Sequence, residues 1–580
     1  MEQKEFSWLG DVSRSRLKQD MAHISQWYRY TGSWGGEACV DYILGQLREF
    51  GIPCWAESFE FLRSYPIITR LQVEENGVFR PVQALAAVFS ASCQDLQGPL
   101  WCDEATNGTD LEESRQFSAM RGKIVLTHRR HGEDILKAFH HGALAVISVW
   151  DTPEEKLHHN TIGTVWGGPA PENLWRFGSV PAVCVTKREG EKLWQDAAAG
   201  RVTRARLTVQ MAQKVVTARM PVADIPGQRD SFLLVNGHYD SWYEGVTDNA
   251  AANVSQLECA RVLWKNRHLL QRGVRLVWWG GHSDGRYAGS AAYADRHYEE
   301  LRQKCVGQLN QDMFSGLNCQ LVGKATGGME QAGLLKNWIQ EAGAACGPIL
   351  DGLNRSSDES FSGIGLPFSM MSTFTPRPDS EWMPHWPESA GPWWHTVDDD
   401  ITRLDEEHLV RDAQVMVHMA ASLATRRDLP VDMPGFIQKM DRVLAQIDGQ
   451  SDPCFTLCDV RARLQKLQKA IEPLQTLIDT GALTNSDPLV QTFAGALMRL
   501  SYSWGSEYEH DDAYPGPSLF SQLRKAVGLT RENSRPVYFL AVQNRFQRQK
   551  NRLLVEIEEL CRRAYEWQAR WEKEQGGVSL

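Results

Sequence analysis

Four polar residues able to hold a metal ion follow apolar segments or loops at widely separated places in the chain. They are His238 in "SFLLVNGHYDS", Asp248 in "TDNAAAN", Asp312 in "LNQDMFSG" and His395 in "GPWWHTVDDD". Imidazole and carboxylate groups are common ligands of Zn²⁺. Each residue alone has a simple structural explanation; Asp248, for example, could be a helix N-cap. Their shared position at strand and loop ends instead predicts one metal site.

Two more segments carry residues suited to chemistry. Asp240 lies two residues after His238, so both side chains of this strand are expected on one face, where Asp240 could orient His238. The segment "WWGGHSDGRYAGS" (278–290) is typical of a buried strand that runs into a loop. Its His282 is suited to general base catalysis, and its Arg286 and Tyr287 to stabilising or binding an anionic group.

The elements that must position these residues alternate between strands and helices. "SFLLVNGHYDS", "GVRLVWWGG" and "CVGQLNQDMFSG" are typical of buried strands, and "DNAAANVSQLECARVLWKN" of a helix. This order predicts a mostly parallel sheet, in which sites lie beyond the carboxyl ends of the strands. A separate strand–helix–strand unit is predicted from about residue 85 to 205, with "RGKIVLTHR", "GEDILKAFHHGA" and "LAVISVW". From about residue 430 the chain is charged and helical in pattern.

The composition is that of an ordinary globular protein. The 580 residues are 42% hydrophobic and 23% charged, and the net charge of −10 argues against nucleic acid or an anionic membrane as a partner. No apolar run approaches the roughly 20 residues of a membrane span, and the polar N-terminus lacks the apolar core of a signal peptide. The twelve scattered cysteines fit reduced thiols. We therefore expect a cytoplasmic protein.

Taken together, "HYDS", "TDNAAA", "NQDMFSG", "SSDESFSGIGLP" and "WWHTVDDDITRLD" resemble the successive motifs of the zinc exopeptidase family. That family contains co-catalytic aminopeptidases, glutamate carboxypeptidase and the inactive transferrin receptor ectodomain. The segments "GKIVL", "HHGALAVIS" and "VPAVCVT" resemble its inserted protease-associated domain. The resemblance implies an α/β fold with four parts: residues 1–84 and 211–428 form the mostly parallel-sheet peptidase domain, 85–210 the inserted α/β domain, and 429–580 a helical domain that makes a homodimer.

The resemblance also implies a ligand set. His238 and His395 would each bind one zinc ion, Asp248 would bridge the two ions, and Asp312 would complete the first site. Asp240 would lie behind His238. One or two zinc ions are expected, with manganese or cobalt as alternatives, and the peptide bond after Asp248 is expected to be cis.

The loop at 282–287 departs from the family pattern. Active members carry two adjacent glutamates there, of which the first transfers a proton and the second binds the second zinc ion. Counting from the strand places His282 and Ser283 at these positions, whereas counting back from Gly289 and Ser290 places Ser283 and Asp284 there. The sequence leaves both registers open.

Three functions follow from this departure. In the first, Asp284 or His282 binds the second ion and the other acts as base, so the protein hydrolyses an amide or peptide bond of a small substrate. In the second, the metal serves non-peptidase chemistry, as in a lyase or a specialised amidase. In the third, the protein is an inactive binding scaffold. The four retained metal-binding residues favour hydrolysis, because buried acids without a cation are costly.

Overall fold

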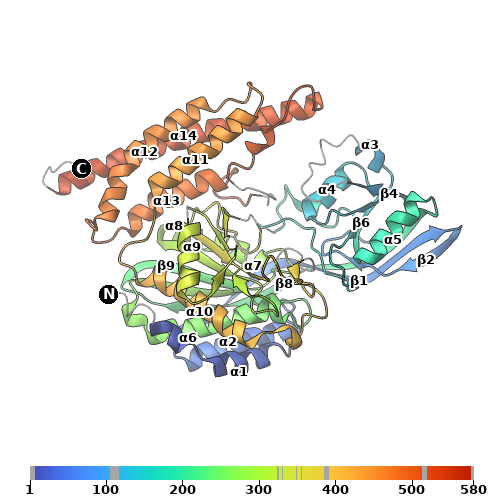
Figure 1. Cartoon of the computed structure of the whole chain (residues 1–580), viewed down its shortest axis with the longest axis horizontal. Coiled ribbons are helices and arrows are strands. Elements are labelled where there is room, and N and C mark those ends of the chain that lie inside the picture. Colours follow the sequence, from blue (N-terminus) through green and yellow to red (C-terminus); the bar gives the residue numbers. More distant parts are fainter. Residues whose placement is uncertain are drawn as a thin grey trace.

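The computed structural model describes residues 7–104, 117–166, 168–322, 325–329, 331–347, 349–353, 356–383, 391–511 and 519–575. An α/β domain lies at the centre, a helical tail above it, and a small α/β unit to one side (Figure 1). No helix in these ranges is both long enough and apolar enough to cross a membrane.

Four parallel strands form the middle of the α/β domain. They are β16 (Phe368–Ser372), β11 (Cys305–Gln311), β9 (Arg229–His238) and β10 (Arg272–Trp279), in this spatial order. The prediction of a parallel arrangement is confirmed for them. Every residue of β10 and β11 is buried, as is typical of parallel strands covered on both faces. The covering helices are α1 (Arg14–Ile24), α2 (Trp34–Glu49), α6 (Ala251–Lys265), α7 (Ala288–Arg296), α8 (Tyr298–Lys304) and α10 (Glu406–Thr425).

Two long antiparallel strands join this domain to the small unit. β1 (Cys54–Glu75) and β8 (Val202–Ile225) pair from Cys54–Ala223 at one end to Glu75–Val202 at the other. The other edge of β8 pairs with β10 near the end of the strand and with β4 of the small unit near its beginning, so one mixed sheet of 14 strands runs through both parts. The sequence predicted two separate units and did not reveal this continuity.

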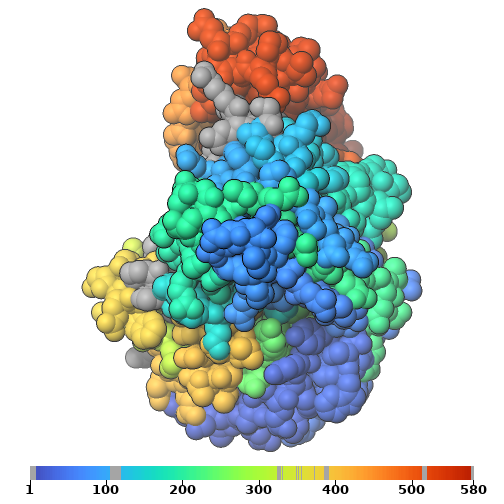
Figure 2. Space-filling model, turned by 90° about the vertical axis from the view of Figure 1, so that its right-hand side faces the viewer, coloured from blue at the N-terminus to red at the C-terminus, as the bar shows by residue number. Residues whose placement is uncertain are grey.

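The small unit contains the strands and helices that the sequence predicted, namely β5 (Ile124–Thr127), α4 (Gly132–His140), β6 (Ala145–Val149), β7 (Ala182–Val185) and α5 (Lys187–Ala198). It also contains three elements that the sequence did not predict: β3 (Leu85–Ala86), β4 (Cys93–Asp103) and α3 (Phe117–Met120). β4, β5, β6 and β7 are parallel neighbours. Figure 2 shows this unit between the red tail and the dark blue helices near the N-terminus.

The helical tail packs on the α/β domain through both apolar and charged contacts. It contains α11 (Met433–Gln450), α12 (Cys458–Asp479), α13 (Asp487–Tyr502) and α14 (Pro536–Glu574). Asp487 at the start of α13 pairs with the fully buried Arg272 at the start of β10, and its other contacts include the Ser231 hydroxyl at 2.5 Å. A buried pair of this kind fixes the position of the tail, because removing one partner would leave an uncompensated charge.

Candidate metal centre

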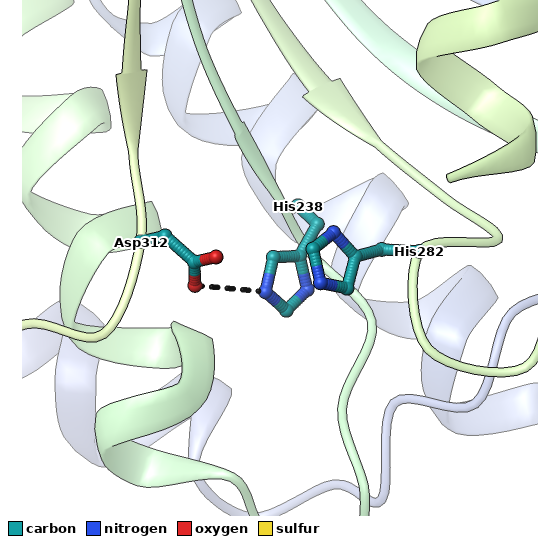
Figure 3. Close-up of side chains that lie close together, drawn as sticks. All are labelled: His238, His282 and Asp312. Atoms are coloured by element: carbon teal, nitrogen blue, oxygen red, sulfur yellow. Dashed lines mark hydrogen bonds and ion pairs between the residues drawn. The ribbon is translucent and has the colours of Figure 1, made fainter. Parts of the chain in front are cut away.

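Three site residues reach one point because their strands end at the same level. β9 ends at His238, and its register with β11 places Asn310 opposite Asn236, so Asp312 lies level with His238. β10 ends at Trp279, opposite His238, and the following loop carries His282. Figure 3 shows His238 between Asp312 and His282. Within the described residues, these three form a group whose candidate ligand atoms all lie within 4.8 Å of one another.

Asp248 connects this group to His395. Its Oδ1 lies 3.1 Å from His238 Nε2, and its Oδ2 lies 3.2 Å from His395 Nε2. On the other side, His238 Nε2 lies 3.3 Å from Asp312 Oδ1. The structure thus brings together His238, Asp248, Asp312 and His395, with Asp248 between the two imidazoles.

The chemistry of this donor set fits divalent zinc. Nitrogen and oxygen ligands bound at about 2.0–2.1 Å in a tetrahedron lie about 3.4 Å apart, close to the spacings observed here. Both histidines donate Nδ1–H to a backbone carbonyl: His238 to that of Asp240 at 3.0 Å, and His395 to that of His159 at 2.9 Å. These bonds direct each Nε2 towards the carboxylates, which is the usual orientation of a metal-binding histidine.

The charges of this buried cluster also favour a bound cation. Burial lowers the pKa of His238, but hydrogen bonds to Asp240, Asp248 and Asp312 outweigh burial and raise it well above its usual value. Burial raises the pKa of Asp248, but the two imidazoles hold it well below its usual range. Several other acids are buried nearby, and a metal ion would balance their charge. They are Asp240, Asp284, Asp312, Asp358 and Asp399.

Hydrogen bonds to Asp399 fix the backbone around Asp248. Asp399 accepts hydrogen bonds from Thr247 N at 2.9 Å, Thr247 Oγ1 at 2.8 Å and Asp248 N at 3.1 Å. Burial raises the pKa of Asp399 to about 7, and the Asp248 charge adds to the rise. The peptide bond between Asp248 and Asn249 is cis, as the resemblance implied. Asp399 therefore positions Asp248, a role that the sequence analysis did not assign.

His282 lies against His238. The two rings are 3.6 Å apart between centroids and only 11° from parallel. His282 Nδ1 donates to Asp358 Oδ2 at 2.7 Å, and Asp358 is fully buried. The Tyr287 ring packs edge-on against His282 with a centroid distance of 4.6 Å.

Asp284 lies in a different environment from His282. Its Oδ2 accepts from Arg63 Nε on β1 at 2.7 Å. Burial raises the pKa of Asp284 to about 7, and the charge of Asp240 adds to the rise. Asp240 itself accepts from the backbone N–H groups of His282 and Ser283 at 3.3 and 2.9 Å. Asp240 therefore contacts both His238 and the 282–287 loop, whereas Asp284 pairs with a cation of the protein.

Arg286 and Tyr287 both adopt left-handed backbone conformations, with φ of 55° and 67°. Such conformations are costly for residues with side chains and cluster at functional sites. The Arg286 guanidinium lies 5.2 Å from the Tyr287 ring centre, and its Nε is buried without a hydrogen-bond partner. Arg286 is thus a cation near His282 with no acid of the described residues paired to it.

Some residues near the site escaped the sequence analysis. Asp399 and Ser360 were given no role, Ser290 served only to count the register of the loop, and Asp358 was quoted only within the motif "SSDESFSGIGLP". Only the order of acids in "HTVDDD" and "SSDES" could have suggested Asp399 and Asp358. The sequence offers two further candidates, Arg355 as a residue that could bind a carboxylate and His385 as a residue of a pocket wall, and both lie outside the described residues.

Comparison with known sequences shows which proteins the central domain is similar to. The sequence model of peptidase family M28 matches residues 221–420. An aminopeptidase of Pseudomonas aeruginosa (strain UCBPP-PA14) is 26% identical over 330 residues, which cover 53% of this chain and 58% of the relative. A probable glutamate carboxypeptidase of Zea mays is 23% identical over 385 residues, covering 52% of each. The chain therefore spans a little over half the length of these curated relatives.

Solved structures show the same fold. An aminopeptidase from Aneurinibacillus sp. strain AM-1 aligns with a TM-score of 0.56 at 21% identity, covering 74% of this chain and 98% of that one. A zinc aminopeptidase from Bacillus subtilis aligns with a TM-score of 0.51 at 20% identity, covering 71% and 94%. Residues 221–420 thus match the sequence model of peptidase family M28, and the solved structures share the fold of this chain.

Proposed function

We propose that the protein is a metal-dependent hydrolase that cleaves an amide or peptide bond of a small substrate. The observation that carries this proposal is the position of Asp248, whose two carboxylate oxygens each face a different imidazole. A carboxylate so placed is suited to bridge two divalent ions. His238, Asp312 and Asp248 would hold one ion, and His395 and Asp248 the other, with zinc favoured over manganese or cobalt.

The proposed reaction assigns separate tasks to the metal and to His282. The bound cation would polarise the scissile carbonyl and lower the pKa of a water molecule. His282 Nε2 accepts a proton as the water oxygen bonds to the carbonyl carbon. It returns that proton to the leaving nitrogen as the carbon–nitrogen bond breaks. Tyr287, beside the His282 ring, is placed to contact the oxyanion or the leaving group.

The contacts of the small unit support a small substrate. Its loop at 158–166 contacts three segments of the site: His159 N donates to His395 O at 3.1 Å, Thr161 Oγ1 to Ser283 O at 3.1 Å, and Trp166 Nε1 to Ser357 O at 2.7 Å. The His159 ring also stacks on Trp242, with centroids 4.0 Å apart. A loop that is hydrogen-bonded to three segments around the site narrows access to the site. Narrow access favours a substrate with a short chain next to the cleaved bond.

Metal analysis and a substrate screen test this proposal. We expect about two zinc ions per chain in the purified protein, and turnover of aminoacyl, dipeptide or N-acyl amino acid substrates that stops when the metal is removed and resumes when zinc is added. One ion per chain with no hydrolysis would favour the lyase or specialised amidase. A protein that binds no divalent metal would instead be a scaffold, and the hydrolase proposal would be wrong.

We further propose that the helical tail makes a homodimer. The 39-residue helix α14 leaves several apolar side chains exposed, and contact with a second copy would bury them. They are Val537, Leu540, Val555 and Tyr565. Light scattering of the eluting protein should give a mass near twice 65.5 kDa. A mass of a single chain at all concentrations would exclude the dimer without affecting the hydrolase proposal.

A further inference from the structure

A buried chain of hydrogen bonds lies behind His282. Asp358 Oδ2 accepts from His282 Nδ1 at 2.7 Å, and Asp358 Oδ1 accepts from Ser290 Oγ at 2.7 Å. Ser290 Oγ in turn lies 3.0 Å from Ser360 Oγ. Asp358 and Ser290 are fully buried, and Ser360 is 4% exposed. Both carboxylate oxygens of Asp358 are therefore bonded, which fixes the plane of the group that faces His282.

This bonding pattern sets the state of the imidazole. A carboxylate oxygen can only accept, so the neutral ring of His282 keeps its proton on Nδ1 and leaves the lone pair on Nε2. The alternative tautomer would place two acceptors 2.7 Å apart, and the Asp358 carboxylate is fully buried. Asp358 thus selects the tautomer in which Nε2 can accept a proton.

The stacking of His282 on His238 separates the tasks of the two rings. A metal ion bound to an imidazole lies in the plane of that ring, along the nitrogen lone pair. Because the two rings are nearly parallel and their centroids are 3.6 Å apart, their nitrogen lone pairs lie in separate planes and do not point at one common atom. His282 is therefore placed beside the metal site and not within the ligand set of His238.

From these contacts we infer that Asp358 is a positioning residue for His282, and that this aspartate–histidine pair performs the proton transfer for which active relatives use a glutamate. The inference rests on the proposed function. It also explains how a loop without glutamate could retain hydrolysis, since an imidazole oriented by a carboxylate is an effective general base.

The short segment 357–360 connects this pair to the proposed metal ligands. Ser357, which precedes Asp358, donates from Oγ to Asp312 Oδ2 at 3.1 Å, and Trp166 of the small unit donates to the Ser357 carbonyl. The segment 357–360 therefore contacts a proposed ligand on one side and the proposed base on the other. Its position sets the separation between His282 and the metal centre.

Nitrogen NMR of the full chain with ¹⁵N-labelled histidine tests the tautomer directly, without a substrate. The signals of His282 are identified by their absence in His282→Ala. We expect the zinc-loaded protein to show His282 protonated on Nδ1, and Asp358→Ala to shift the neutral ring towards protonation on Nε2. A tautomer that is the same with and without the Asp358 carboxylate would overturn the inference, whatever the activity of the protein.

Kinetics test the role of the pair in turnover. Asp358→Asn and Asp358→Ala should lower kcat by about 100-fold or more with KM changed less than about threefold, and zinc content should stay that of the unchanged protein. The double variant with His282→Ala should be no slower than His282→Ala alone, because both residues serve one step. Additive losses, or a kcat unaffected by Asp358→Ala, would overturn the inference.

Asp295→Asn is the matched control. It removes an aspartate that bonds a histidine with the same 2.7 Å distance, His510 Nε2, in a surface pair outside the site. We expect unchanged kcat and an unchanged His282 tautomer. If the unchanged protein hydrolyses nothing, the proposed function fails, and the NMR result still decides whether Asp358 orients His282.

Discussion

At the scale of single residues, the two registers left open by the sequence correspond to two different environments. His282 lies against His238, and Asp284 lies against Arg63. This difference could not be predicted from the sequence because it depends on the path of the loop, where Arg286 and Tyr287 both take left-handed conformations. Sequence spacing alone does not specify such a path.

The zinc content of two variants distinguishes these environments. Asp248→Asn should lower zinc binding at least tenfold, because it removes the charge between the two imidazoles while keeping the shape of the side chain. Asp284→Asn should retain the zinc content of the unchanged protein, since Asp284 pairs with Arg63. Elemental analysis after dialysis measures both. Loss of zinc in Asp284→Asn would identify Asp284 as a ligand and reject our assignment.

Arg286 provides a second prediction at this scale. Because no described acid pairs with it and it lies near His282 through Tyr287, we expect it to bind a carboxylate of the substrate. Arg286→Met should raise KM about tenfold or more for substrates with a free carboxylate and leave KM of their amides unchanged. Arg267→Met, which removes a guanidinium stacked on Trp264, is the control and should change neither. Equal effects on acids and amides would exclude carboxylate recognition.

At the scale of elements, the residues that followed apolar strands could be predicted to converge. His238 and Asp312 follow β9 and β11, which are parallel neighbours, so a strand-level prediction was enough to place them together. The partners on loops could not be predicted in this way. Asp358 and Asp399 reach the site from connections whose course depends on packing against Ser290 and Thr247, far away in the sequence.

A buried acid on α10 makes stability depend on pH. Asp412 is fully buried, and burial raises its pKa to about 7 despite hydrogen bonds from Arg411 and Ser315. The ordinary value in an unfolded chain is about 3.9. Between about pH 4 and 7 the native state therefore binds more protons at this site than the unfolded state, so its contribution to stability falls as pH rises and levels off above 7.

Asp412→Asn isolates this contribution. The uncharged amide does not lose a proton, so the variant should gain stability relative to the unchanged protein as pH rises from 5 to 8. Urea unfolding at several pH values, followed by circular dichroism, measures the difference. Asp459→Asn, which removes a half-exposed acid paired with Lys550, is the control and should show no comparable trend. A difference that stays constant from pH 5 to 8 would show that Asp412 is charged in the native state over this whole range.

At the scale of the whole molecule, three parts predicted separately are joined by contacts that the sequence did not indicate. The α/β class, the helical character of the tail and three strands of the small unit, β5, β6 and β7, followed from the sequence pattern. The shared sheet of β1 and β8 did not, because nothing in the composition of a strand specifies a partner about 150 residues away. The sequence also did not indicate that the tail contacts the segment around Asp358.

That contact links the tail to the proposed site. Gly495 of α13 lies against Gly365, which ends the stretch that begins with Ser357 and Asp358. A β-carbon at Gly495 would lie 2.4 Å from the carbonyl oxygen of Gly365, too close for either backbone to stay in place. Nearby, the Tyr502 hydroxyl of α13 donates to the Gly328 carbonyl at 3.0 Å. Helix α13 therefore supports the segment that positions His282.

Gly495→Ala tests whether this support matters for turnover. The added methyl should destabilise the protein by about 1–3 kcal/mol, as overpacking usually does, and should lower kcat while zinc content stays the same. Gly45→Ala, on α2, is the control. Its added β-carbon would have no neighbouring atom within 4 Å, and alanine favours a helix. Denaturant unfolding, elemental analysis and kinetics together separate the outcomes. If Gly495→Ala lost stability but kept kcat, the tail would hold the fold together without setting the geometry around Asp358.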